Sequence, residues 1–239
     1  MVEVASEKLF HLRHIRADTR GRFCDLGVFY DGKTVREAKL EALVLGDWHN
    51  RVGEPKVYAA TYDMIEALKP QRVVLHDFFD GHSVSHWLLR KPVRELLIHY
   101  QDKGLFALDG ELQAAGETLL ALAKLCPEVV VVFSNHHAFL HRYLEEGRFM
   151  QEPHNFRTAV DLLAWMAAKD YNDPVEAGIR KYHDLPSNIR FLKEDEDYKI
   201  HGYQLGAHGD KSDTGGKFGG GYGGITRKEI AWGKSISGH

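Results

Sequence analysis

The sequence predicts a mixed α/β fold that contains a parallel sheet. Ala42 to Leu45 forms an apolar run, Val57 to Leu68 has helical spacing, and Val73 to Leu75 forms a second apolar run. A strand, a helix and a strand within about thirty residues make a βαβ unit, whose two strands are parallel. A third run, Val129 to Phe133, is apolar throughout. That composition is expected of a strand buried on both faces.

Composition sets limits on the class of protein. The chain has 239 residues, of which 44% are hydrophobic and 27% charged, as in an ordinary globular domain, and we expect a single domain over 1–239. The net charge of −3 gives no global signature of nucleic-acid binding, although net charge does not report how charges are distributed. No run reaches the ~18 apolar residues of a membrane span, and no signal-peptide pattern is present. Two cysteines fit a reducing cytoplasm.

The first segment of the chain, residues 1–32, is predicted to be extended. Residues 1–4 alternate like a strand and 9–12 continue it, while Phe23 to Tyr30 forms a further strand. Asp31-Gly32 is a hairpin signal. Because no polar leader precedes the first strand, we expect the chain to begin inside a larger protein.

The middle of the chain is predicted to be largely helical. The helix from Val57 ends before Pro70, residues 86–103 have a helical pattern, and Asp109 is placed to cap a helix from Glu111 to Leu125. Further helices are expected at 137–146, at 156–169 with one apolar face, and from Asp173-Pro174, where Asp caps and Pro comes first.

The C-terminal part has a different pattern. Asn188 to Leu192 and Tyr198 to Leu205 are predicted to pair as antiparallel strands, with the acidic run 194–197 at a solvated turn. Residues 209–224 are rich in glycine, which favours a loop. A loop of that length is usually functional or mobile.

Polar side chains follow several of these strands. Asp77 and Asp80 come directly after Val73 to Leu75, and in open α/β sheets ligands bind beyond the carboxyl ends of strands. Two carboxylates there suit a divalent metal, while a helix cap or a turn is the ordinary alternative. The pattern recurs at four other segment ends, which supply Asp47 and His49; Asn135, His136 and His137; His208 and Asp210; and His239. Recurrence favours the metal, and mixed nitrogen and oxygen ligands suit Mn, Fe or Zn.

The order of these motifs resembles the calcineurin-like metallophosphoesterases. The matching segments are Asp47-Trp-His49, His76-Asp77-Phe-Phe-Asp80, Ser134-Asn135-His136-His137, His208 and Gly238-His239. The resemblance runs from about residue 41 to the last residue. It implies a two-sheet sandwich flanked by helices, with two divalent ions, most favourably Mn, with Fe or Zn as alternatives.

The resemblance also assigns roles. Asp47, His49 and Asp77 would hold one ion, and Asp77, Asn135, His208 and His239 the other. His136 would be the catalytic histidine that faces the phosphate, with Asp80 as the second catalytic residue.

This chain departs from the family pattern. His76 and Ser134 stand where the family has glycines, and His137 replaces the acidic residue that would orient His136. The chain also ends inside the last motif, before its second histidine. We therefore expect a fragment that lacks one ligand.

A narrower resemblance covers Phe23-Cys-Asp-Leu, the segment from Glu41 to His49, His201-Gly-Tyr and the glycine-rich loop. These segments are similar to the pre-early DNA-degrading metallophosphatases of large tailed phages. The resemblance implies a metal-dependent DNase that acts on DNA in the host cytoplasm.

The predicted function is thus a two-metal phosphodiesterase with DNA as substrate, and a homo-oligomer is left open. The alternatives are a phosphomonoesterase on proteins or nucleotides, and an inactive scaffold of the same fold. His82 and His86 are candidate substrate contacts, although surface or capping roles explain them equally well. Lys211 and Lys217 could follow a phosphate backbone or merely keep the loop soluble. Phe78, Phe79 and Trp87 are expected in the core.

Overall fold

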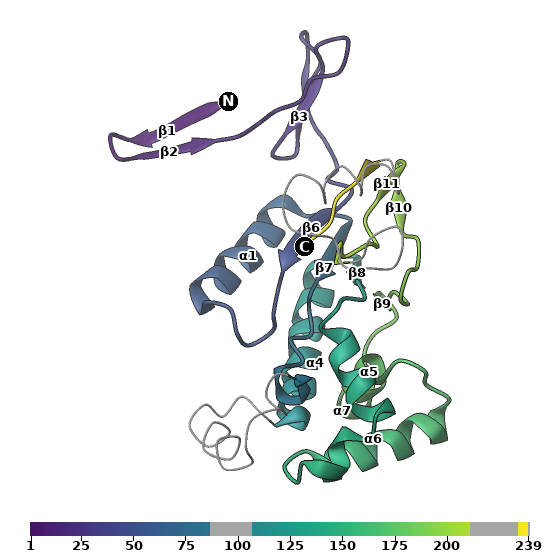
Figure 1. Ribbon diagram of the computed structural model, residues 1–239. Helices are drawn as coiled ribbons and strands as arrows, with labels where there is room; N and C mark the ends of the chain where they lie inside the picture. Colours follow the sequence, from purple (N-terminus) through teal and green to yellow (C-terminus); the bar gives the residue numbers. More distant parts are fainter. Residues whose placement is uncertain (87–106, 211–233, 239) are drawn as a thin grey trace.

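The computed structural model describes residues 1–86, 107–210 and 234–238. Its centre is a four-stranded parallel sheet with the strand order β6-β7-β8-β9 (Figure 1). The strands are β6 Leu43–Asp47, β7 Arg72–His76, β8 Glu128–Val131 and β9 Ile189–Phe191. Leu45, Leu75, Val131 and Phe191 lie in register across the sheet. All four carboxyl ends therefore open onto the same edge.

The described helices contribute to one core on one face of this sheet. They are α1 Pro55–Leu68, α4 Leu108–Leu125, α5 His137–Glu145, α6 Phe156–Lys169 and α7 Pro174–Tyr182, with the short η1 His82–Val84 and η2 Arg148–Gln151. Val73 and Leu75 of β7 share this core with Ile65 of α1 and Leu119 of α4. The helix-facing cluster is the larger of the two described cores.

The opposite face of the parallel sheet meets a small second sheet. Its strands are β10 Lys199–Ile200, β11 Tyr203–Gln204 and β12 Lys234–Ser235. Val74 and Val130 point to this side and form a second core with Tyr198 and Leu205. Because successive side chains of a strand point to opposite faces, the apolar runs supply both cores. The predicted α/β sandwich is confirmed.

The N-terminal strands form two separate small sheets (Figure 1). One is the hairpin of β1 Val2–Ser6 and β2 Leu9–Leu12. The other contains β3 Phe23–Asp25, β4 Val28–Tyr30 and β5 Val35–Glu37.

Two predictions for this region were wrong. Residues 9–12 do not continue the first strand but pair back on it. Phe23 to Tyr30 is not one strand, because a turn at Leu26 and Gly27, both with positive φ, divides it into β3 and β4. The Asp31-Gly32 turn is confirmed: the Asp31 carboxylate accepts from the Lys33 and Thr34 amides.

The predicted antiparallel pairing of 188–192 with 198–205 was also wrong. β9 joins the parallel sheet beside β8, and residues 199–204 fold back on themselves as the β10–β11 hairpin around His201-Gly202. The reason is burial: Ile189 and Leu192 are 3% and 2% exposed and contribute to the two cores, which a surface hairpin could not provide.

The predicted helix ends were partly right. Asp173 caps α7 by accepting from the Val175 and Glu176 amides at 2.8 Å. Asp109 does not cap α4: the helix begins at Leu108, whose amide donates to Asn155 Oδ1 at 2.9 Å. The expected helix over 86–103 lies outside the described residues from 87 onward. Within the part of the chain that is described, no helix combines the length and hydropathy needed to cross a membrane.

Candidate metal centre

The backbone beyond β6 and β7 brings Asp47, His49 and Asp77 together at the carboxyl edge of the sheet. The Trp48, His49 and Asn50 amides donate to the carbonyls of His76, Asp77 and Phe78 at 3.0, 2.8 and 3.0 Å. His49 and Asp77 both have φ of 44°. A left-handed non-glycine residue costs about 1–3 kcal/mol, so two paired ones mark a conformation that the surrounding fold imposes.

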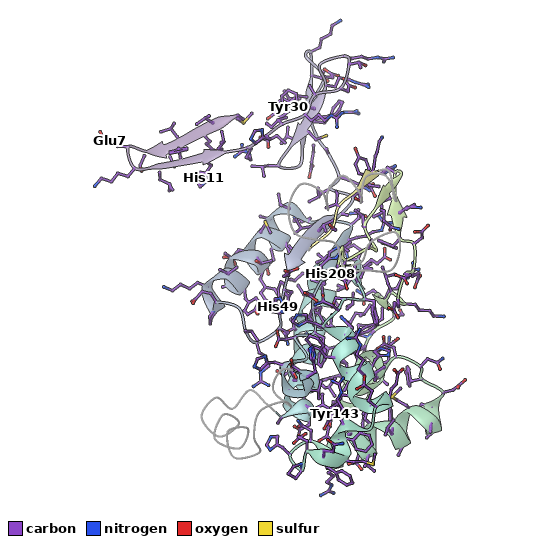
Figure 2. All side chains as sticks on the ribbon, viewed as in Figure 1. Glu7, His11, Tyr30, His49, Tyr143 and His208 are labelled. Carbon is purple, nitrogen blue, oxygen red and sulfur yellow. The ribbon has the colours of Figure 1, made fainter. Side chains whose placement is uncertain are left out.

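One group of ligand-type side chains consists of Asp47, Asp77 and His208. Their candidate ligand atoms all lie within 4.8 Å of one another. His208 Nε2 is 3.2 Å from Asp77 Oδ2, and both side chains are buried, whereas Asp47 is exposed. Figure 2 shows His208 close to His49 at this end of the sheet.

A second group consists of His49, Asp80 and His136, again within 4.8 Å. The His49 and His136 rings are 4.6 Å apart, and Asp80 Oδ1 is 2.9 Å from His49 Nδ1. The two groups adjoin, because His49 Nε2 is 3.8 Å from Asp77 Oδ2.

The partner of His49 Nδ1 sets the tautomer of that ring. A carboxylate only accepts hydrogen bonds, so Nδ1–H donates to Asp80 and the lone pair is on Nε2, the atom that faces Asp77. Metal-binding histidines in general donate their other N–H to a carboxylate or a carbonyl. His49 is thus arranged as a metal ligand. Asp80 either orients the His49 ring or acts as a further ligand.

His136 is held by the backbone. Its Nδ1 donates to the Asp80 carbonyl oxygen at 2.5 Å, and Phe139 packs against the ring with centroids 4.8 Å apart. The next residue, His137, is 2% exposed and shares a 2.9 Å hydrogen bond with Ser134 Oγ. The position that departs from the family pattern therefore binds Ser134, and the Asp80 carbonyl orients His136.

The electrostatics of the site favour the ionised form of the Asp77 side chain. Burial opposes its ionisation, but hydrogen bonding to His208 and the field of His208 outweigh burial and hold the pKa of Asp77 well below its usual range. The hydrogen bond to Asp80 raises the pKa of His49. Burial lowers the pKa of His76 to about 4, so His76 is neutral beside the site.

The residues present fit divalent cations. The buried atoms Asp77 Oδ1 and Asn135 Oδ1 have no hydrogen-bond partner among the described residues, although buried polar atoms are normally paired. Carboxylate and amide oxygens with imidazole nitrogens form the donor set of Mn, Fe or Zn.

The C-terminal segment passes beside the group that contains Asp47. A Cβ at Gly238 would lie 2.4 Å from His76 Cβ and 3.4 Å from Asp47 Oδ1, so glycine permits the close approach. His239, Lys211 and Lys217 lie outside the described residues, and their roles stay predictions.

The two other candidate substrate residues lie around the site. His82 Nδ1 is 3.9 Å from Asp80 Oδ2, with 47% of its side chain exposed. The His86 ring packs on Phe139 with centroids 5.6 Å apart. Phe78 and Phe79 are fully buried, as expected; Trp87 lies outside the described range.

Sequence reasoning missed Glu111 of α4. Its carboxylate accepts from the His82 amide at 3.0 Å, from the Ser83 amide at 3.3 Å and from the Ser83 hydroxyl, and so it holds the loop that follows Asp80. Burial raises the pKa of Glu111 to about 7. A signal was available, because Glu111 falls on the helix face that Leu108, Leu112 and Ala115 bury.

Comparison with known proteins gives one relative. The chain is 26% identical over 212 residues to Protein A1 of Escherichia phage T5, an alignment that covers 80% of this chain and 38% of that protein. The chain thus spans less than two fifths of the length of this relative. No protein-family model matches the chain, and no solved structure matches it. The similarity relates the chain to a phage protein.

Proposed function

We propose that the protein is a divalent-metal-dependent phosphodiesterase that cleaves DNA. The observation that carries the proposal is the pair of adjoining ligand groups at one sheet edge, connected by the 3.8 Å approach of His49 Nε2 to Asp77 Oδ2. Asp77 has two carboxylate oxygens and approaches both His208 of its own group and His49 of the other group, so it is the residue suited to serve two ions.

The motif resemblance divides the ligands differently from the two groups, in which Asp47 lies with Asp77 and His208, and His49 with Asp80 and His136. By the resemblance, Asp47, His49 and Asp77 would hold one ion. Asp77, Asn135 and His208, with His239 from the C-terminal segment, would hold the other. Two bound divalent ions, with Mn the first candidate, would supply an activated water and a clamp on the phosphate oxygens. The buried anionic state of Asp77 provides the charge that such ions require.

We assign His136 a role toward the substrate. Because its Nδ1 donates to the Asp80 carbonyl, Nε2 is the ring atom left to exchange a proton with a phosphate oxygen or a leaving group. The Asp80 carboxylate lies 3.8 Å from Nδ1 and would stabilise the protonated ring.

DNA as the substrate, and the host cytoplasm as the location, are supported by the relation to a phage protein and by the motif resemblance. Ligand groups of this kind serve phosphate monoesters as well as diesters, so the substrate class has to be tested directly.

The test compares three substrates: linear duplex DNA, p-nitrophenyl phosphate and its bis-ester, each with Mn-reconstituted protein. We expect cleavage of DNA and of the bis-ester to dominate, and EDTA to abolish both. DNA cleavage should fall steeply with salt, because backbone phosphates are bound electrostatically. Hydrolysis of the monoester alone would refute the diesterase, and full metal loading without any hydrolysis would identify a scaffold.

A further inference from the structure

The turn between β6 and α1 carries His49 and is held by one hydroxyl group. Tyr58 of α1 accepts a hydrogen bond from the Gly53 amide at 2.8 Å. Its own hydrogen points to the His49 carbonyl at 2.7 Å, with the Trp48 carbonyl at 3.1 Å. A tyrosine hydroxyl has a single hydrogen, so the shorter contact, to His49, is the stronger one.

The conformation of this turn needs a contact from outside the turn to stabilise it. His49 has φ of 44° and Arg51 has φ of 72°, and such conformations persist only where the surroundings determine them. Within the turn, the Val52 amide donates to the His49 carbonyl at 3.0 Å. That carbonyl thus accepts from both Val52 and Tyr58, and Tyr58 connects it to the rigid helix.

The contact between the Tyr58 hydroxyl and the turn is closely packed on both sides. A Cβ at Gly53 would lie 2.6 Å from the Tyr58 hydroxyl oxygen, so only glycine allows the turn to approach it. On the other side the Tyr58 ring packs on Trp48, with centroids 5.0 Å apart. Trp48 in turn donates from Nε1 to Asn50 Oδ1 at 3.3 Å.

We propose that Tyr58 is a positioning residue, whose hydroxyl fixes the backbone of His49 and thereby directs His49 Nε2 at Asp77 and Nδ1 at Asp80. The inference rests on the proposed function for its consequence, which is the affinity of one of the two metal sites. The Tyr58 hydroxyl contacts backbone atoms of Trp48, His49 and Gly53, so Tyr58 acts through His49.

Tyr58→Phe removes only the hydroxyl, and Tyr62→Phe is the matched control. Tyr62 lies one turn further along α1 and also packs on Trp48, with centroids 6.2 Å apart. Amide hydrogen exchange of the metal-free protein is the first readout. We expect the Gly53 and Val52 amides to exchange at least about tenfold faster in Tyr58→Phe, with Val74 unchanged, because the loss is local. Unchanged exchange at Gly53 and Val52 would overturn the proposal.

Calorimetric titration with Mn is the second readout. Tyr58→Phe should weaken one of two sites by about 10- to 100-fold, the range typical for loss of an outer support of a metal ligand, and leave the other within about twofold. Equal weakening of both sites, or the same split in Tyr62→Phe, would assign Tyr58 a merely structural role and overturn the inference. A wild-type protein that binds no Mn would refute the proposed function instead, and the exchange measurement would still decide whether Tyr58 holds the turn.

Gly53→Ala tests the same contact independently. Its Cβ would displace the Tyr58 hydroxyl, so it should accelerate exchange at Val52, and its effect should not add to that of Tyr58→Phe. Full additivity would contradict a shared contact.

Discussion

The parallel sheet and the N-terminal strands use similar residues in opposite environments. Val73, Val74 and Leu75 of β7 are completely buried. In the β1–β2 hairpin, Val4 and Phe10 are cross-strand partners but are 71% and 65% exposed. Figure 1 shows this hairpin extending away from the helices and the central sheet.

The forces that hold the two regions differ accordingly. Arg13 connects the hairpin to the next sheet through hydrogen bonds to Glu3 at 2.9 Å and to Asp25 at 2.9 and 3.0 Å. Ion pairs at the protein surface contribute little to stability, and a lone hairpin is marginally stable in water. The parallel sheet lies between two cores, and this packing supports His49 and Asp77 in their left-handed conformations.

The comparison predicts that a substitution at the sheet edge can abolish metal binding and activity without unfolding the sheet. Asp77→Asn should abolish metal binding and activity while the fold persists, because it removes the shared anionic charge but keeps the side-chain volume. Metal analysis and circular dichroism of the purified variant measure both. Full metal content with full activity would exclude Asp77 as the shared ligand.

A second substitution separates substrate chemistry from metal binding. His136→Ala should retain the metals and lose turnover by a factor on the order of 10²–10⁴, since the ring is proposed to transfer a proton. Steady-state kinetics with parallel metal analysis test this prediction. If the metals are lost with the ring, His136 is a ligand and the assigned role is wrong.

The contrast in burial is tested by one deletion of side-chain atoms in each region. Leu75→Ala leaves a cavity in a close-packed core and should lower the free energy of unfolding by about 2–5 kcal/mol. Phe10→Ala, at an exposed position, should change it by about 0.5 kcal/mol or less. Urea unfolding compares the two variants. A loss at Phe10 as large as that at Leu75 would show that the hairpin is covered in solution.

The buried carboxyl group of Glu111 makes the stability of the protein depend on pH. Because burial raises its folded pKa from 4.5 to about 7, the folded state binds this proton more tightly than the unfolded state. Its stabilising contribution is complete below about pH 4.5 and is lost as the pH rises to about 7, by about 3 kcal/mol in total.

Glu111→Gln keeps an acceptor for the Ser83 hydroxyl and removes the titration. The difference in unfolding free energy between the variant and the wild type should therefore change between pH 5 and pH 8 in favour of the variant. The buried histidines His76 and His137 occur in both proteins, so their opposite pH dependence cancels in this difference. A difference that stays constant with pH would contradict a buried, titrating Glu111.

The sequence by itself determined the features that depend on local periodicity and local chemistry. The apolar runs of β6, β7 and β8, the helical spacing of α1 and α6, and the cap at Asp173 could be predicted because each depends on residues within a few positions. The arrival of Asp47, Asp77 and Asn135 after successive strands followed from the same runs, since parallel strands end at a common edge.

Only the tertiary structure decided which distant groups meet. β9 was assigned the wrong partner because a three-residue strand does not encode its neighbour; the two cores select it. The bond from His49 to Asp80 spans 31 positions, and the bond from Glu111 to Ser83 spans 28. Such contacts depend on how helices and loops pack around the sheet, and burial then sets the charge of the groups that they enclose.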